Sequence, residues 1–170
     1  MYATKIAVAA LMAVLPTLAR AADTQTFDQR MQPILQSYLS IHDALASDRL
    51  TGVVQAAQAI VAESDKVARE SVSGAHAAHY KELPARLASA GKALAAVTDI
   101  EAAREAFKEL SRAMSMWGTM SKPPGVEVVF CSMAKGSWLQ KKGPIRNPYY
   151  GAHMLACGEV VGGDTGSGTP

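Results

Sequence analysis

The sequence predicts an all-α fold, an antiparallel up-and-down four-helix bundle with an irregular C-terminal loop segment packed on it. Apolar residues recur at helical spacing in four successive stretches between Phe27 and Trp117. Each stretch is followed by residues that interrupt helices, so short connections should join neighbouring helices. The composition, rich in alanine with only 6% aromatic residues, favours closely packed helices.

The first helix is predicted over residues 27–47. Its apolar stripe advances by alternating steps of four and three residues: Phe27, Met31, Ile34, Tyr38, Ile41 and Leu45. Pro33 either kinks the first turns or marks a later beginning. The second helix is predicted over residues 49–70, with Asp48 as its candidate N-cap. Its inner face is formed by Leu50, Val53, Ala57, Ile60 or Val61, and Val67.

The third and fourth helices follow the same pattern. The third carries the stripe Leu87, Ala90, Leu94 and Val97. Pro84 either occupies its first turn or kinks a helix that begins earlier. Thr98 and Glu101 form a capping-box pair that opens the fourth helix. Its stripe is Ala103, Phe107, Leu110, Met114 and Trp117, and Lys122-Pro123-Pro124-Gly125 prevents it from continuing.

The N-terminus has the parts of a secretory signal peptide over residues 1–21. Lys5 precedes an uncharged apolar run, and Ala19-Arg20-Ala21 forms a small-x-small cleavage site ahead of Ala22. The alternative is an uncleaved anchor. After cleavage we expect a periplasmic or secreted protein without a membrane span, and of these locations we favour the envelope of a Gram-negative bacterium.

Residues 22–170 carry no net charge, and their composition indicates a domain followed by a short polar tail. Removal of residues 1–21 takes away Lys5 and Arg20 and no acidic residue, so 15 basic and 15 acidic residues remain. This balance argues against a nucleic-acid partner, which needs a clustered basic surface. Residues 22–161 are predicted to form one helical-bundle domain with a Cys/Met loop. Residues 162–170, rich in Gly, Ser and Thr, are predicted to form a disordered tail.

The loop over residues 130–160 holds the side chains that carry chemistry. One end contains a Cys-x-Met pattern, and the other contains a His-Met-x-x-Cys pattern. Between them, Asn147-Pro148-Tyr149-Tyr150-Gly151 is rich in turn formers and should bring the two ends together. Thiolate and thioether sulfurs together select Cu(I) or Ag(I) over hard cations. The predicted metal site consists of Cys131, Met133, Met154 and Cys157, with His153 as an optional ligand.

The same residues have a second interpretation. In an oxidising compartment, two cysteines form a disulfide more often than any other arrangement. Cys131 and Cys157 would then close a loop and stabilise the fold by about 3–4 kcal/mol. Met133 and Met154 would fill gaps in a small core, and His153 would be solvated. The sequence leaves the disulfide and the metal site as alternatives.

A longer motif surrounds these residues. Its positions are Cys131, Met133, Gly136, Trp138-Leu139, Ile145, Asn147-Pro148-Tyr149-Tyr150-Gly151, Met154 and Cys157-Gly158. This motif resembles the C-terminal signature of a periplasmic domain-of-unknown-function family that is described as heavy-metal associated. Members stand alone after signal peptides or are appended to the adaptor (membrane fusion) subunits of copper and silver efflux systems. The resemblance extends over residues 34–160, and it departs at Ser132, where the family usually has proline.

The resemblance implies a protein that handles soft metal. We expect a periplasmic Cu(I) or Ag(I) buffer or a donor for metal efflux, with an efflux adaptor or another envelope protein as partner. The alternative is a disulfide-stapled module that docks on an envelope protein and binds no metal. The sequence has no Cys-x-x-Cys-His for haem attachment, no nucleophile elbow and no His-Glu-x-x-His. We therefore do not expect an enzyme.

Overall fold

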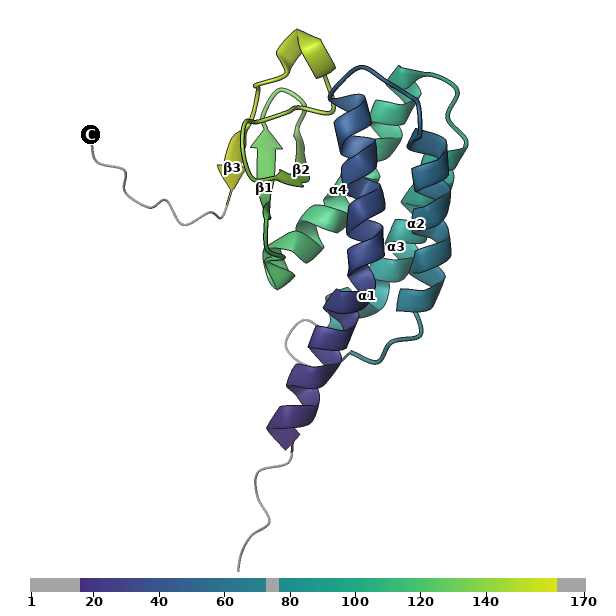
Figure 1. Ribbon diagram of the computed structural model, residues 1–170, viewed down its shortest axis with the longest axis vertical. Helices are drawn as coiled ribbons and strands as arrows, with labels where there is room; N and C mark the ends of the chain where they lie inside the picture. Colours follow the sequence, from purple (N-terminus) through teal and green to yellow (C-terminus); the bar gives the residue numbers. More distant parts are fainter. Residues whose placement is uncertain (1–15, 73–76, 162–170) are drawn as a thin grey trace, which may run out of the picture.

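Four helices follow one another along the chain in the computed structural model, which describes residues 16–72 and 77–161 (Figure 1). They are α1 (Pro16–Leu45), α2 (Val53–Val67), α3 (Ala77–Ala95) and α4 (Ile100–Ser121). Each helix packs against the next one in the sequence, and α1 also contacts α4. The prediction of four helices that pack in sequence is therefore confirmed.

The predictions for the two ends of the chain fall largely outside the described residues. This holds for residues 1–15 of the predicted signal peptide and for the predicted tail over residues 162–170. Within the described ranges, no helix is both long enough and apolar enough to cross a membrane.

Several helix boundaries differ from the predicted ones. Pro33 lies inside α1 and Pro84 lies inside α3, so neither proline begins its helix. Asp99, and not Thr98, caps α4, because its carboxylate accepts a backbone hydrogen bond of 2.8 Å from the first turn. Asp48 lies in the turn after α1 and does not cap α2.

The apolar stripes predicted on the four helices meet in one core. Tyr38 and Phe107 stack with their ring centroids 5.0 Å apart and join α1 to α4. Leu50 and Val97 are only partly buried. The buried stripe residues are Phe27, Met31, Ile34, Tyr38, Ile41, Leu45, Val53, Ala57, Ile60, Val67, Leu87, Ala90, Leu94, Ala103, Phe107, Leu110, Met114 and Trp117.

The C-terminal part is a sheet and not an irregular loop, so the all-α prediction is wrong there. The strands β1 (Val126–Cys131), β2 (Gly136–Lys141) and β3 (Glu159–Val161) pair antiparallel in the order β2-β1-β3. A short 3-10 helix, η1 (Gly151–Met154), lies between β2 and β3. The sequence does not predict β2, because Trp138 and Leu139 are adjacent apolar residues and lack the apolar and polar alternation that indicates a strand. β3 has three residues and forms only by pairing with β1.

One face of the sheet packs on α4 and α1 (Figure 1). Leu139 enters this contact at Gly118, where a Cβ atom on the glycine would lie 2.6 Å from a methyl carbon of Leu139. The Tyr38 hydroxyl accepts a hydrogen bond of 3.0 Å from the Leu139 backbone N–H. Trp138 projects from the opposite face and is buried beneath the chain that runs from β2 through η1 to β3. The sheet thus places the C-terminal segment beside the bundle.

Candidate functional site

The two cysteines meet at one end of the sheet. Cys131 is the last residue of β1, and Cys157 lies between η1 and β3. Both are free thiols, and their sulfur atoms lie 2.8 Å apart. The Cys131 side chain is buried, whereas Cys157 is partly exposed. The prediction that the loop brings its two cysteines together is therefore confirmed.

The contact shifts the pKa values of the two thiols in opposite directions. Burial acts to raise the pKa of Cys131, but hydrogen bonds from the Cys157 thiol, from the backbone at Ala134 and Met133, and from Asn147 outweigh it and lower the pKa. The hydrogen bond with Cys131 raises the pKa of Cys157, and burial adds to this effect. Cys131 therefore ionises first, and its thiolate then accepts a hydrogen bond from the Cys157 thiol, which keeps its proton. The thiolate is the form of cysteine that binds metal ions.

Asn147 holds the segment that carries Cys157. Its side chain is fully buried, and its amide donates a hydrogen bond of 2.8 Å to the Cys157 carbonyl oxygen. Its side-chain oxygen accepts a hydrogen bond from the Tyr149 backbone N–H at 2.9 Å, and its own backbone N–H donates to the Leu155 carbonyl oxygen at 2.7 Å. The predicted turn at Asn147 is present, and it also fixes the backbone of Cys157 beside Cys131.

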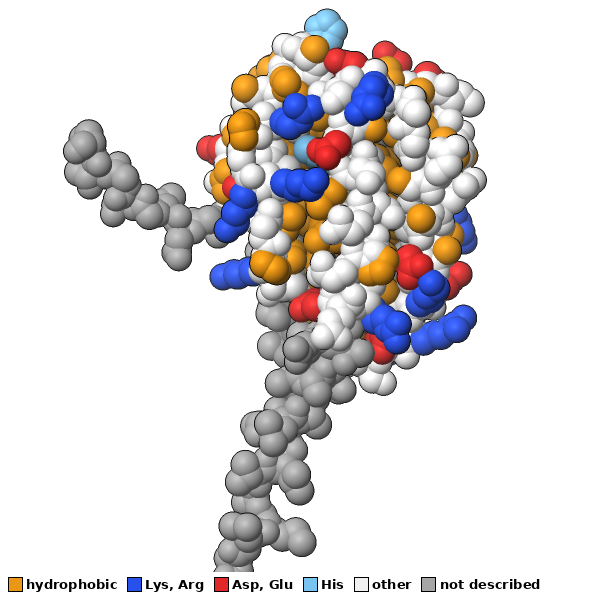
Figure 2. Space-filling view, in the orientation of Figure 1, with side chains coloured by type: hydrophobic (Ala, Val, Ile, Leu, Met, Phe, Trp, Pro, Cys, Tyr) orange, Lys and Arg blue, Asp and Glu red, His pale blue; other side chains and the backbone are white. Residues whose placement is uncertain are grey.

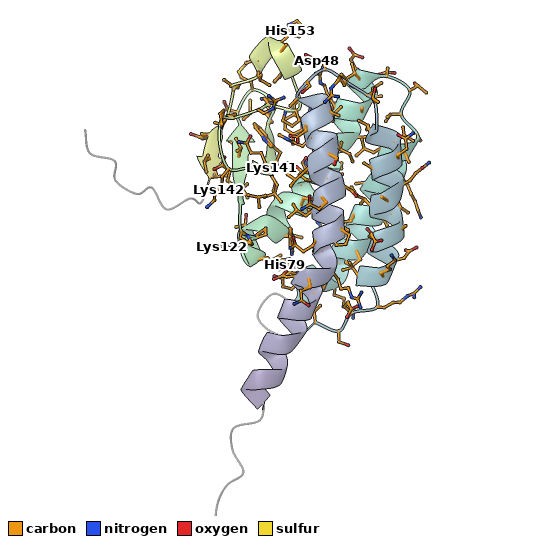
Figure 3. All side chains as sticks on the ribbon, viewed as in Figure 1. Asp48, His79, Lys122, Lys141, Lys142 and His153 are labelled. Carbon is orange, nitrogen blue, oxygen red and sulfur yellow. The ribbon has the colours of Figure 1, made fainter. Side chains whose placement is uncertain are left out.

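The other predicted ligands belong to the segments next to the two cysteines and differ in their exposure. Met133 lies in the turn between β1 and β2 with 63% of its surface exposed. Met154 ends η1 and is half-buried, and its carbonyl oxygen accepts a hydrogen bond of 2.9 Å from the Cys157 backbone N–H. The Tyr150 hydroxyl donates to the Met133 carbonyl oxygen at 3.2 Å and so joins the two sulfur-bearing segments. His153 is exposed at the outer surface of η1 (Figure 3).

The segments that meet at the thiol pair carry four sulfur-bearing side chains. Two cysteine thiols meet, and a methionine lies within three residues of each of them in the chain. In the part of the chain that the structure describes, no three His, Cys, Asp or Glu side chains are grouped so that they could hold a metal ion. Met133, which the disulfide interpretation assigns to a small core, is exposed. The arrangement therefore offers two thiols directly and thioethers from the adjoining segments.

A polar latch, formed by Asp48, Arg104 and Ala152, fastens η1 to the bundle. The Asp48 carboxylate accepts a hydrogen bond of 3.0 Å from the Ala152 backbone N–H and forms an ion pair with Arg104. The Ala152 hydrogen bond, followed by the one from Arg104, lowers the pKa of Asp48. Arg104 also donates to the Pro148 carbonyl oxygen at 3.3 Å. Gly151 has a φ of 55° and sits against Asp48 and Arg104, where no Cβ atom fits.

A second link joins α1 to the segment that precedes the Asn147 turn. The buried ring of His42 donates from Nε2 to the Arg146 carbonyl oxygen at 2.9 Å, and its Nδ1 lies 3.1 Å from the Asp43 carboxylate. The hydrogen bond with His42 lowers the pKa of Asp43. The Arg146 guanidinium donates to the Ser47 hydroxyl at 2.8 Å. Sequence reasoning missed both links, although His42 lies four residues after Tyr38 and three before Leu45, a spacing that places this polar side chain on the apolar stripe.

Comparison with known proteins places the helical part of the chain in a family. A family model described as a protein of unknown function (DUF3347) matches residues 34–123. This range includes the C-terminal part of α1 and all of α2, α3 and α4, and it ends before β1, so Cys131 and Cys157 lie beyond it. No curated protein and no solved structure matches the chain.

Proposed function

The chain belongs to the DUF3347 family, whose function is unknown, and from the geometry of its cysteine pair we propose that it binds a soft monovalent metal ion, Cu(I) or Ag(I). The observation that carries the proposal is the contact of two cysteine sulfurs that are 26 residues apart in the sequence. One sulfur is anchored in a strand, and the other lies on a partly exposed segment. The role would be that of a periplasmic buffer or of a donor for metal efflux.

Cys131 and Cys157 supply the soft anionic donors. The lowered pKa of Cys131 favours its thiolate, and a bound cation would displace the remaining proton from Cys157. Two sulfurs that each lie about 2.3 Å from the same metal ion can be up to about 4.6 Å apart. The two sulfurs lie 2.8 Å apart in the structure, so they need to separate only slightly to admit an ion between them. Rotation of the partly exposed Cys157 side chain would supply this movement, because the Cys131 side chain is buried.

Met133 and Met154 supply thioether donors beside the thiols. A thioether needs no deprotonation and suits Cu(I) far better than hard cations or Zn(II). The exposed side chain of Met133 has space to turn toward an ion at the thiol pair. The hydrogen bond from Tyr150 keeps the backbone of Met133 close to the segment that carries Met154. His153 precedes Met154 in the chain and stays an optional ligand.

A competition titration of the reduced protein against a coloured Cu(I) chelator tests this proposal. We expect Cu(I) binding by the wild type and its loss in Cys131→Ser. Replacing Met133 and Met154 together by leucine conserves size, so stability should change little while Cu(I) affinity falls about tenfold or more. The matched control replaces Met116 and Met120, two half-buried methionines of α4, by leucine and should leave the affinity unchanged.

The disulfide-stapled interaction module is the alternative function. The contact between the thiols favours it, because oxidation would join Cys131 to Cys157 and tie the η1 segment to the sheet. The titration is therefore repeated after oxidation. Loss of Cu(I) binding on oxidation would assign the metal to the thiols. Absence of Cu(I) binding by the reduced and folded protein would rule out the metal proposal and favour the module.

A further inference from the structure

A groove lies between the sheet and the end of α4, apart from the thiol pair. Its volume is about 700 Å³. One wall is the segment over residues 118–124, which ends α4 and carries Pro123 and Pro124, and the other wall is the sheet. The apolar residues contributed by the sheet are Val126, Val128, Leu139, Val160 and Val161. Figure 2 shows apolar side chains between lysine and arginine side chains on the visible face of the molecule.

The groove exists because α4 packs mainly against β2, the strand at the other side of the sheet from β3. Val128 pairs with Leu139 on one side and with Val161 on the other, so these three side chains project from the same face. Leu139 is buried against Gly118, whereas Val128 is half-buried and Val161 is 38% exposed. Val160 is 44% exposed as well. Two of the three large apolar side chains that are exposed among the described residues therefore belong to β3.

β3 is also an edge strand in the described part of the chain. Its inner side pairs with β1, and no other described strand pairs with its outer side. The N–H and C=O groups of such an edge can pair with an extended peptide. Charged side chains usually protect an edge strand, but two of the three residues of β3 are valines.

The rim of the groove is basic. Lys122 and Lys142 line it with exposed side chains, and neither forms an ion pair within residues 16–72 and 77–161. The carboxylate of the groove, Glu127, accepts hydrogen bonds from the Gln140 amide at 3.0 Å and from the Gly143 backbone N–H at 3.3 Å. Figure 3 shows both lysines on the side of the molecule where the sheet lies. The rim therefore offers two cations to a ligand.

We propose that this groove docks an extended segment of a partner protein in which apolar and acidic residues alternate. Its backbone would add a strand beside β3, and the apolar side chains on the groove face of that strand would pack against Val161 and Val128. Acidic side chains at the end of the segment, where it leaves the sheet, would pair with Lys122 and Lys142. Charge complementarity selects this occupant, because a basic segment would bring like charges together at the rim. No residue that lines the groove is a proposed metal ligand, so docking and metal binding are separable.

The test measures the binding of short fluorescent peptides to the full chain by anisotropy. One peptide alternates Val and Glu, and the other alternates Val and Lys. We expect the acidic peptide to bind and the basic peptide not to bind. Reversal of both rim charges in Lys122→Glu/Lys142→Glu should weaken binding of the acidic peptide about tenfold or more. The matched control, Lys81→Glu/Lys92→Glu, makes the same charge change at two exposed lysines of α3 and should bind like the wild type.

Two further measurements tie peptide binding to the groove itself. Val161→Thr keeps the β-branched shape but replaces one methyl group by a hydroxyl, and it should weaken binding of the acidic peptide while the circular dichroism spectrum stays unchanged. Cu(I) affinity should stay at the wild-type value in both charge-reversal variants, so failure here is distinguishable from failure of the metal proposal.

Three kinds of result would overturn the docking proposal. The first is equal binding of the two peptides, or no binding of the acidic peptide by folded protein. The second is a dimer in sedimentation velocity that Val161→Thr dissociates, which would assign the groove to a second copy of the chain. The third is tighter peptide binding by a chain that ends at Val161, which would assign the groove to residues 162–170.

Discussion

At the scale of single residues, Asn147 forms one hydrogen bond that its local sequence predicts and one that it does not predict. Its place in an Asn-Pro-Tyr-Tyr-Gly run predicts a turn, because the asparagine side chain can accept a hydrogen bond from the backbone two residues further on. The structure contains this bond, to Tyr149. The bond from Asn147 to the Cys157 carbonyl oxygen spans ten residues and is absent from any local pattern. Residue type alone therefore predicted the turn and the meeting of the two cysteines, but not the hydrogen bond by which Asn147 holds the Cys157 backbone.

The opposite pKa shifts of the thiols lead to a prediction for single-cysteine variants. In Cys157→Ala, the pKa of Cys131 should rise above its value in the reduced wild type, because burial persists while the hydrogen bond from the partner thiol is lost. In Cys131→Ala, the pKa of Cys157 should fall, because the hydrogen bond that raises it most is removed. Ultraviolet absorbance of the thiolate, followed against pH, measures both. Unchanged pKa values would show that the thiols do not interact in solution.

The same shifts predict how stability depends on pH. The lowered pKa of Cys131 stabilises the folded state above the unfolded thiol pKa, and this contribution is lost as pH falls through the folded pKa. The raised pKa of Cys157 has the opposite sign, and its contribution is lost as pH rises through the folded pKa. The free energy of unfolding, measured in urea, should therefore be higher for the reduced wild type than for Cys131→Ala by the largest amount at a pH near the ordinary thiol pKa. A pH-independent difference would contradict this.

At the scale of elements, α4 and β2 approach closely because Gly118 has no side chain. A glycine inside a helix costs about 1 kcal/mol relative to alanine, so helix propensity does not explain this residue. Packing does, since Leu139 occupies the space where a Cβ atom would lie. The hydrogen bond from the Leu139 backbone to Tyr38 ties the same strand to α1. The position of the sheet thus depends on a few contacts at one strand.

Gly118→Ala should lower the free energy of unfolding by about 1–3 kcal/mol, because the new methyl group forces Leu139 out of its place. In a Leu139→Ala background the same change should be neutral or stabilise by up to about 1 kcal/mol, because the obstacle is gone and the helix gains propensity. Urea unfolding of the four proteins in this double-mutant cycle gives both values. An equal loss in both backgrounds would show that contact with Leu139 is not the cause.

At the scale of the whole molecule, the bundle and the sheet share one core. A chain of aromatic contacts runs across their boundary. Trp138 of β2 meets Tyr149 edge to face at 5.6 Å between ring centroids, Tyr149 lies 6.2 Å from Phe107 of α4, and Phe107 stacks on Tyr38 of α1. Such contacts couple the two parts energetically, because neither can be exposed without loss of packing in the other.

The shared core predicts that the chain unfolds in one step. The sequence has two tryptophans, Trp117 in α4 and Trp138 in β2. In Trp117→Phe and Trp138→Phe, the remaining tryptophan reports on the sheet and on the bundle, respectively. Within each variant, the urea transition followed by fluorescence should coincide with the one followed by far-ultraviolet circular dichroism. A sheet that loses its fluorescence signal before the helices unfold would show that the two parts fold independently.

The sequence by itself determined the four helices, their buried faces and the set of soft donors. Helices are readable because their hydrogen bonds and apolar stripes connect residues three or four positions apart, as from Phe27 to Leu45. Only the tertiary structure decided that residues 126–161 form a three-stranded sheet and that Asp48 holds η1. Each of these depends on partners far apart in the chain. β3 in particular is stable only on β1, since a strand has no hydrogen bonds of its own.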